Sequence, residues 1–277
     1  FELFYGSACK GLELLSSLSI GAGWPEHLVH RIRLLRGLGY QRMGSWDRSE
    51  YELRQSYSLA QKTNDTLQIA AVLTNLACTA VERGSWDEAE EYGRAASKLH
   101  GALSTALDVL IPLRLNVANL AFYQGNVREA YTLYLGVYEH ATSCDYTEFK
   151  TEVEACLGLA ALQLRDSSAA RRWIEECDTR EATLVGMQER FKVEWLWGYC
   201  QRSSNPDEVR DRLIRVAGSQ EPVDRVGSLK LQWLATMLLP ASRHEVEEMR
   251  RRLGEAGLGW FLYFSDRWRR LADGCFL

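Results

Sequence analysis

The sequence predicts an all-α fold, a right-handed superhelix of stacked antiparallel helix pairs. The first observation is that the tetrapeptide Gly-Ser-Trp-Asp at 44–47 returns at 84–87. The second is that the position two residues after this tetrapeptide, Ser49 and Ala89, belongs to a series spaced by 37 to 41 residues: Gly11, Ser49, Ala89, Ala130, Ala170, Val209 and Val246. A fixed period of this size indicates supersecondary units that bury their apolar faces only against their neighbours.

Within each unit the apolar spacing predicts two helices joined by a tight turn. The unit with the clearest pattern has Ile69, Val72, Leu73 and Leu76 on one helical face, and a second such face follows its turn. Glycine stands at the turn in three units, at Gly44, Gly84 and Gly125, where it supplies the left-handed conformation that ends a helix. The fourth unit has Arg165 there, which puts its turn geometry in question.

These signals divide the chain into a series of repeats. The expected segments are a truncated repeat at 1–23, repeats at 24–65, 66–105, 106–146, 147–182, 183–221 and 222–257, and a terminal capping helix at 258–277. The last segment is rich in aromatic residues, so we expect it to pack across the last repeat. Because the chain begins at Phe1 in the middle of a repeat, we expect it to be a segment of a larger protein.

Composition limits the class of protein. The formal net charge of −4 is mildly acidic, so no overall positive field attracts nucleic acid or an anionic membrane. No apolar run approaches the roughly 20 residues that a membrane span needs. The seven cysteines are scattered and odd in number, which favours free thiols in a reducing compartment such as the cytoplasm.

Motifs for chemistry are weak. The chain has no phosphate-binding Gly-rich loop ending in Lys-Ser or Lys-Thr. His27 and His30 lie on adjacent helix positions, but two ligands make a poor metal site, and we interpret them as part of a solvated helix start. We therefore expect no enzyme activity, no metal and no cofactor.

The repeat pattern resembles that of the tetratricopeptide repeat family. The residues that carry the resemblance are Leu76-Ala77, Gly84, Trp86 and Ala89, with weaker copies at Gly44, Trp46 and Ser49 and at Gly125, Val127 and Ala130. The units here are longer than the 34 residues of the usual repeat. Long units of this kind resemble the superhelical sensor domains of bacterial signal-transducing ATPases and LuxR-type transcription activators, and also peptide-sensing regulators and a cell-division scaffold.

This resemblance implies a non-enzymatic array that binds a protein, a peptide or a small polar inducer. It further implies the sensor or scaffold segment of a multidomain bacterial signalling or transcription regulator. An alternative is a regulatory segment fused to an enzyme such as a kinase, cyclase or protease. Fold alone does not decide between them.

The expected ligand site is a groove lined by the first helix of each pair. Asn75 and Asn116 both stand nine residues before the turn glycine of their repeats, in a row that in tetratricopeptide proteins commonly holds the main chain of an extended peptide. The other expected groove residues are Asn119, Tyr123, Arg42, Glu82 and Trp195. The alternative is that Asn75 and Asn116 only bond to neighbouring helices.

The sequence leaves open two other kinds of interaction, with nucleic acid and with a second copy of the chain. Arginines at 250–252 and at 267, 269 and 270 could meet phosphates, with Trp268 stacking on a base, but a solvated helix face balanced by glutamates is the favoured interpretation. The N-terminal end, Phe1 to Leu18, has no capping helix and could support a homo-oligomer.

Overall fold

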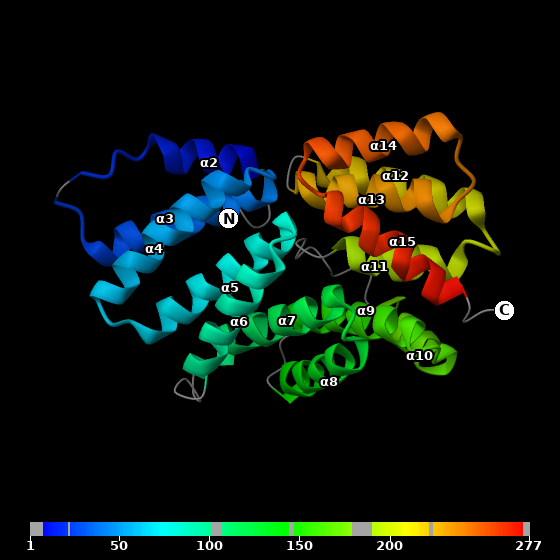
Figure 1. Ribbon diagram of the computed structural model, residues 1–277, viewed down its shortest axis with the longest axis horizontal. Helices are drawn as coiled ribbons and strands as arrows, with labels where there is room; N and C mark the ends of the chain where they lie inside the picture. Colours follow the sequence, from blue (N-terminus) through cyan, green and yellow to red (C-terminus); the bar gives the residue numbers. More distant parts are fainter. Residues whose placement is uncertain are drawn as a thin grey trace.

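The computed structural model describes residues 8–21, 23–100, 107–143, 147–178, 190–221 and 224–273. These residues form 14 helices and, within the described part, no strand. Labelled as in Figure 1, the helices are α2 (Ala8–Ser17), α3 (Glu26–Arg42), α4 (Trp46–Lys62), α5 (Thr66–Arg83), α6 (Trp86–His100), α7 (Leu107–Gln124), α8 (Val127–Ser143), α9 (Thr147–Gln163), α10 (Ser167–Asp178), α11 (Arg190–Gln201), α12 (Pro206–Gln220), α13 (Arg225–Leu238), α14 (Arg243–Glu255) and α15 (Gly259–Asp273). The predicted all-α solenoid of antiparallel helix pairs is confirmed.

The turn between the two helices of a pair has one geometry in four repeats. Gly44, Gly84 and Gly125 have φ of 71°, 73° and 88°. In each case the next residue donates its N–H to the carbonyl five residues earlier, as in Ser85 to Ala80 at 2.8 Å, which is the Schellman arrangement that satisfies a helix end. Arg165 keeps this turn with φ of 61°, so the fourth repeat preserves the geometry without glycine.

The small residue that marks the repeat lies where paired helices touch. Ser49, Ala89, Ala130, Ala170 and Val209 are all fully buried. Each stands near the start of the second helix of its pair, where a larger side chain would separate the two helices. The period read from the sequence is therefore a period of helix contacts.

The array curves until its two ends meet. Figure 1 shows α2 and α3 on one side of the upper edge and α12 to α14 on the other, with α7 to α10 along the lower edge. Contacts between α13 and α3 close the curve. Side chains of the first three repeats therefore face side chains of the last ones across a short interior space.

Helix α15 crosses this interior and does not lie across the last repeat alone, which differs from our expectation. Trp260 donates its indole N–H to the carbonyl of Glu82 in α5 at 2.7 Å, and Trp268 donates to the carbonyl of Leu159 in α9 at 3.3 Å. Carbonyls near a helix C-terminus lack partners within the helix. The indole of Trp260 satisfies one such carbonyl, that of Glu82 in the last turn of α5, while the aromatic rings of α15 bury apolar surface.

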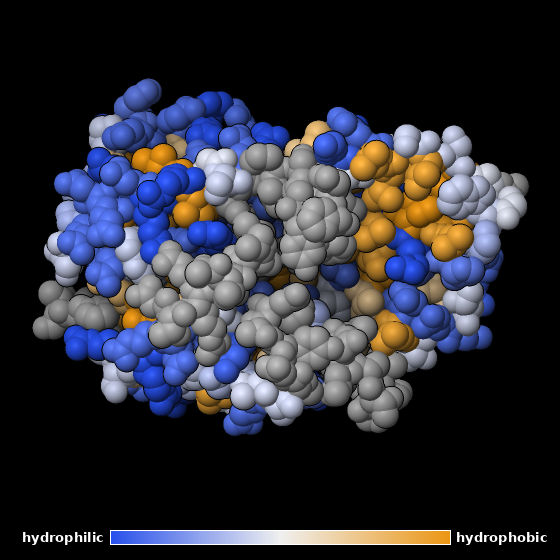
Figure 2. Space-filling model, turned by 180° about the vertical axis from the view of Figure 1, so that it is seen from behind, coloured by the Kyte–Doolittle hydropathy of each residue, from blue (hydrophilic) through white to orange (hydrophobic). Residues whose placement is uncertain are grey.

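The outer face of the first helices carries exposed apolar side chains. Figure 2 shows the molecule from behind, with an apolar area on the side of the N-terminal helices. Leu14, Leu18, Trp24 and Leu28 are 58%, 38%, 37% and 39% exposed. Residues 1–7, which belong to the expected oligomer contact, lie outside the described part of the chain.

Candidate functional site

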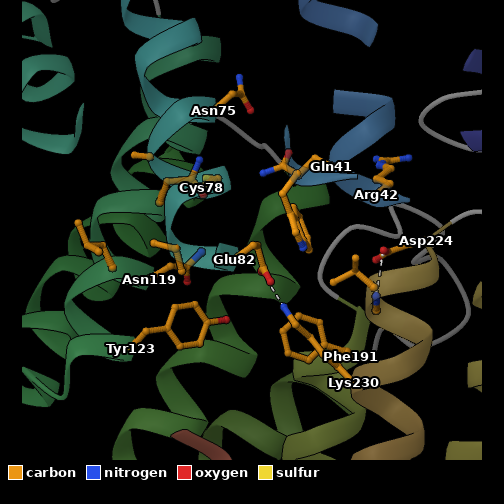
Figure 3. A pocket seen from close by; sticks show the side chains of 17 residues that line it. Gln41, Arg42, Asn75, Cys78, Glu82, Asn119, Tyr123, Phe191, Asp224 and Lys230 are labelled. Carbon is orange, nitrogen blue, oxygen red and sulfur yellow. Dashed lines mark hydrogen bonds and ion pairs between the residues drawn. The ribbon is translucent and has the colours of Figure 1, made fainter. Parts of the chain in front are cut away.

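A cavity lies where the two halves of the array face each other. It is lined by residues of α3, α4, α5 and α7 from the first repeats and of α11 and α13 from the later ones (Figure 3). Its volume is about 130 Å³, whereas one water molecule needs roughly 10–15 Å³ by the same measure. It is lined by Gln41, Arg42, Trp46, Asn75, Ala77, Cys78, Val81, Glu82, Asn116, Asn119, Leu120, Tyr123, Phe191, Asp224, Val226, Gly227 and Lys230.

Six of the seven residues expected in the groove line this cavity. They are Arg42, Asn75, Glu82, Asn116, Asn119 and Tyr123, and they come from the first helix of three successive repeats. Equivalent positions in stacked repeats face the same side of the array. The structure thus brings together side chains that are up to 81 residues apart in the chain.

Trp195 is the exception, and its expected place in the groove is wrong. Its side chain is fully buried, and its ring packs on Phe261, Phe264 and Trp268 with centroid distances of 5.7, 5.9 and 4.7 Å. Helix α15 covers the position that the repeat register would otherwise leave open. Phe191, one helical turn earlier on α11, lines the cavity in its place.

The far side of the cavity was not predicted from the sequence. Phe191, Asp224 and Lys230 come from the degraded later repeats, where the repeat pattern is too weak to assign a register. One signal was available. Lys230 is a lysine within the otherwise mainly apolar stretch 226–238. Because burying an unpaired charge is costly, a charge on an apolar helix face predicts a buried partner of opposite charge.

That partner is Glu82. The Lys230 ammonium lies 2.7 Å from Glu82 Oε1 and is 2% exposed. It also lies 4.7, 5.5 and 5.3 Å from the ring centroids of Phe191, Trp260 and Phe261, distances at which an aromatic ring attracts a cation. The second oxygen, Glu82 Oε2, is buried and has no hydrogen-bond partner, so one acceptor at the cavity wall is unsatisfied.

A second pair of opposite charges lies at the junction of α3 and α13. Burial lowers the pKa of the Arg42 guanidinium, and the nearby carboxylate of Asp224 acts in the opposite direction. Arginine remains charged in either case. Asp224 Oδ1 also accepts a hydrogen bond from the Gly227 N–H at 2.9 Å, which caps α13. The cavity walls therefore carry two cations and two anions.

The amides on α5 and α7 have different partners. Asn75 Nδ2 donates to the carbonyl of Ala71 in its own helix at 2.8 Å. Asn119 Oδ1 accepts from Tyr134 Oη at 2.8 Å and from Lys192 Nζ at 2.9 Å, so Asn119 does bond to neighbouring helices. Burial raises the pKa of Tyr134 well above its ordinary value, which keeps that hydroxyl a donor.

Two of the arginines on the last two helices lie close to carboxylates. Arg251 pairs with Glu248 and Glu255 at 2.7 and 2.5 Å, and Arg250 lies 3.8 Å from Asp266. Trp268 is fully buried and cannot stack on a nucleobase. These contacts support the interpretation of a solvated face balanced by carboxylates.

The described residues contain neither a metal cluster nor a membrane span. No group of three or more His, Cys, Asp or Glu side chains is placed to hold a metal ion there. His30 is buried and not part of a solvated helix start, with its ring nitrogens 3.0 Å from the Ser56 carbonyl and 2.7 Å from Gln68 Oε1. No described helix has both the length and the apolar character that crossing a bilayer requires.

Comparison with known families assigns the repeats. The family model described as tetratricopeptide repeat matches residues 28–100. The repeats within residues 28–100 are therefore similar to the tetratricopeptide repeat. The matched region holds the two Gly-Ser-Trp-Asp motifs, and further pairs of helices follow it along the chain.

Comparison with solved structures finds a likeness of fold over nearly the whole chain. The crystal structure of a Rap protein complexed with competence and sporulation factor matches with a TM-score of 0.72 and 13% sequence identity, covering 99% of this chain and 82% of the Rap chain. At this identity the likeness shows the fold alone. No curated protein matches this sequence.

Proposed function

We propose that this tetratricopeptide array binds a peptide, or an extended segment of a protein, in the cavity between its two halves. The observation that carries the proposal is the convergence of Asn75, Asn116 and Asn119 from two neighbouring repeats on one polar cavity. Amides both donate and accept hydrogen bonds, which suits them to a main chain. Aromatic and apolar walls at Tyr123, Phe191 and Leu120 offer surface for side chains.

The paired charges favour a ligand that is polar without a large net charge. Arg42 and Lys230 are balanced by Glu82 and Asp224 on the same walls, so a highly charged ligand would meet a charge of its own sign. The Rap structure was solved in complex with competence and sporulation factor, which supports a ligand-binding role by likeness of fold. A polar small-molecule inducer is the second ligand class that such a cavity suits.

We further propose that the chain performs no catalysis and acts as the sensor or scaffold segment of a cytoplasmic bacterial signalling or transcription regulator. Support comes from the array architecture, because stacked repeats present extended binding surfaces. Fusion to an enzyme remains the alternative context. Self-association through Phe1 to Leu18 stays a prediction that rests on the exposed Leu14 and Leu18.

The test is selection of peptides from a random phage-display library on the folded chain, followed by calorimetric titration of the enriched peptides. The paired variant Asn75→Ala with Asn116→Ala should bind them at least about tenfold more weakly, because two hydrogen bonds are worth about 1–3 kcal/mol together. Gln61→Ala removes an exposed amide outside the cavity and serves as the matched control. Enriched peptides that bind the paired variant undiminished would overturn the proposal.

A further inference from the structure

The amide of Asn119 can face the cavity in only one way. Its Oδ1 lies 2.9 Å from Lys192 Nζ, and an ammonium donates hydrogen bonds and never accepts them. The oxygen must therefore face Lys192, and the opposite assignment of nitrogen and oxygen would place two donors against each other. The NH₂ group of Asn119 is left to the cavity side as a pair of donors.

The same reasoning fixes the orientation of the Asn75 side-chain amide, with nitrogen and oxygen exchanged. Its Nδ2 lies 2.8 Å from the carbonyl oxygen of Ala71, which only accepts. The nitrogen must face its own helix, and the amide oxygen is presented on the side of Glu82 and Gln41 (Figure 3). Asn75 therefore offers an acceptor to the cavity where Asn119 offers donors.

Glu82 strengthens the acceptor character of the same wall. It lies on α5 seven residues after Asn75, two helical turns along the same face. Its Oε2 is buried without a hydrogen-bond partner, and a buried acceptor in this state costs stability until a donor reaches it. The α5 wall thus carries two acceptors, and the α7 wall carries the Asn119 donors.

We propose that the cavity distinguishes the hydrogen-bond donor side of its ligand from the acceptor side. N–H donors of the ligand bind α5 at Asn75 and Glu82, and a carbonyl or carboxylate oxygen of the ligand binds Asn119 on α7. This inference rests on the proposed function. A peptide group satisfies both demands at once, because its N–H and C=O point in opposite directions from the chain. The peptide group is thereby oriented, with its N–H on the α5 side and its C=O on the α7 side.

Lys192 is the positioning residue of this arrangement. It is 2% exposed and does not line the cavity, yet it holds Asn119 Oδ1 and lies 3.3 Å from Glu152 Oε1. Its carboxylate partner keeps the ammonium in place. Lys192 on α11 thereby sets the donor direction of a side chain on α7, 73 residues earlier.

The test uses two isosteric substitutions that each add one negative charge. Asn119→Asp keeps the acceptor for Lys192 and Tyr134, so the fold is retained, but it replaces the donors that face the cavity. Asn75→Asp gives up the bond to Ala71 but keeps an acceptor toward the ligand. For a heptapeptide selected from the phage-display library, we expect Asn119→Asp to weaken binding at least about tenfold and Asn75→Asp to change it by less than about threefold.

A double-mutant cycle separates positioning from general packing. Lys192→Met should weaken peptide binding in the wild-type background and have no further effect in an Asn119→Ala background, whereas a purely structural role would weaken binding in both. Thermal unfolding of each variant shows that it is folded. Equal losses of peptide affinity for the two Asp variants, or a loss confined to Asn75→Asp, would overturn the proposed assignment of donors to α7 and acceptors to α5. If wild type enriches no peptide, the proposed function fails and this inference fails with it.

Discussion

At the scale of single residues, the repeat depends on a few positions whose chemistry is set by backbone geometry. Arg165 stands where three other repeats have glycine, and it holds the left-handed φ of 61°. A residue with a Cβ in this conformation costs roughly 1–2 kcal/mol. The helices on either side therefore hold this turn in place against its local preference.

Arg165→Gly is expected to stabilise the chain by about 1 kcal/mol, because glycine removes the Cβ from a left-handed position. The melting temperature should rise by roughly 2–4 °C for a chain of this size, as measured by circular dichroism. Gly84→Ala is the opposite control and should destabilise, since its φ is 73° and a Cβ there would lie 3.3 Å from Trp260 Cβ. A lower melting temperature for Arg165→Gly would contradict this explanation of the turn.

At the residue scale, the repeat register indicates which side chains share a face, and their binding role stays a prediction. The spacing from the turn glycines placed Asn75 and Asn116 on one cavity. It failed at Trp195 because a helix more than 60 residues later covers that position. The interpretation of His30 as part of a solvated helix start was wrong because its partners, Ser56 and Gln68, lie on the next two helices. A single histidine in the sequence gives no indication of such partners.

At the scale of elements, α15 is the main departure from a simple stack. Its composition predicted burial, and Phe261, Phe264 and Trp268 are indeed buried. Its partners could not be predicted, because they lie on helices up to 178 residues away and no short-range pattern encodes such a contact. The helix joins the C-terminal ends of several first helices into one core.

Trp268→Ala should destabilise the chain by about 3–5 kcal/mol, because the side chain is fully buried against Trp195 and Tyr199. Tyr263→Ala lies on the same helix with its side chain 69% exposed and should stay within about 0.5 kcal/mol of wild type. Urea unfolding followed by tryptophan fluorescence and circular dichroism measures both. Equal effects of the two substitutions would mean that α15 does not occupy the interior.

At the scale of the whole molecule, closure of the array is what builds the cavity. The pair Lys230 and Glu82 spans 148 residues, and Trp46 Nε1 donates to the Ala256 carbonyl at 2.9 Å across 210 residues. The repeat period predicts the stacking of neighbours and the helix face that points inward. It cannot predict how far the array curves, because curvature accumulates from small rotations between repeats.

The central claim is that the cavity between the two halves holds the peptide, and photo-crosslinking tests it most directly. A library-selected peptide carrying benzoyl-phenylalanine would be irradiated with the full chain, and the adducts mapped by mass spectrometry. We predict adducts on cavity-lining residues of α3, α5, α7, α11 and α13, such as Cys78, Leu120 and Phe191, and their loss in the paired Asn75→Ala and Asn116→Ala variant. Adducts confined to α6 and α8, which do not line the cavity, would contradict the claim.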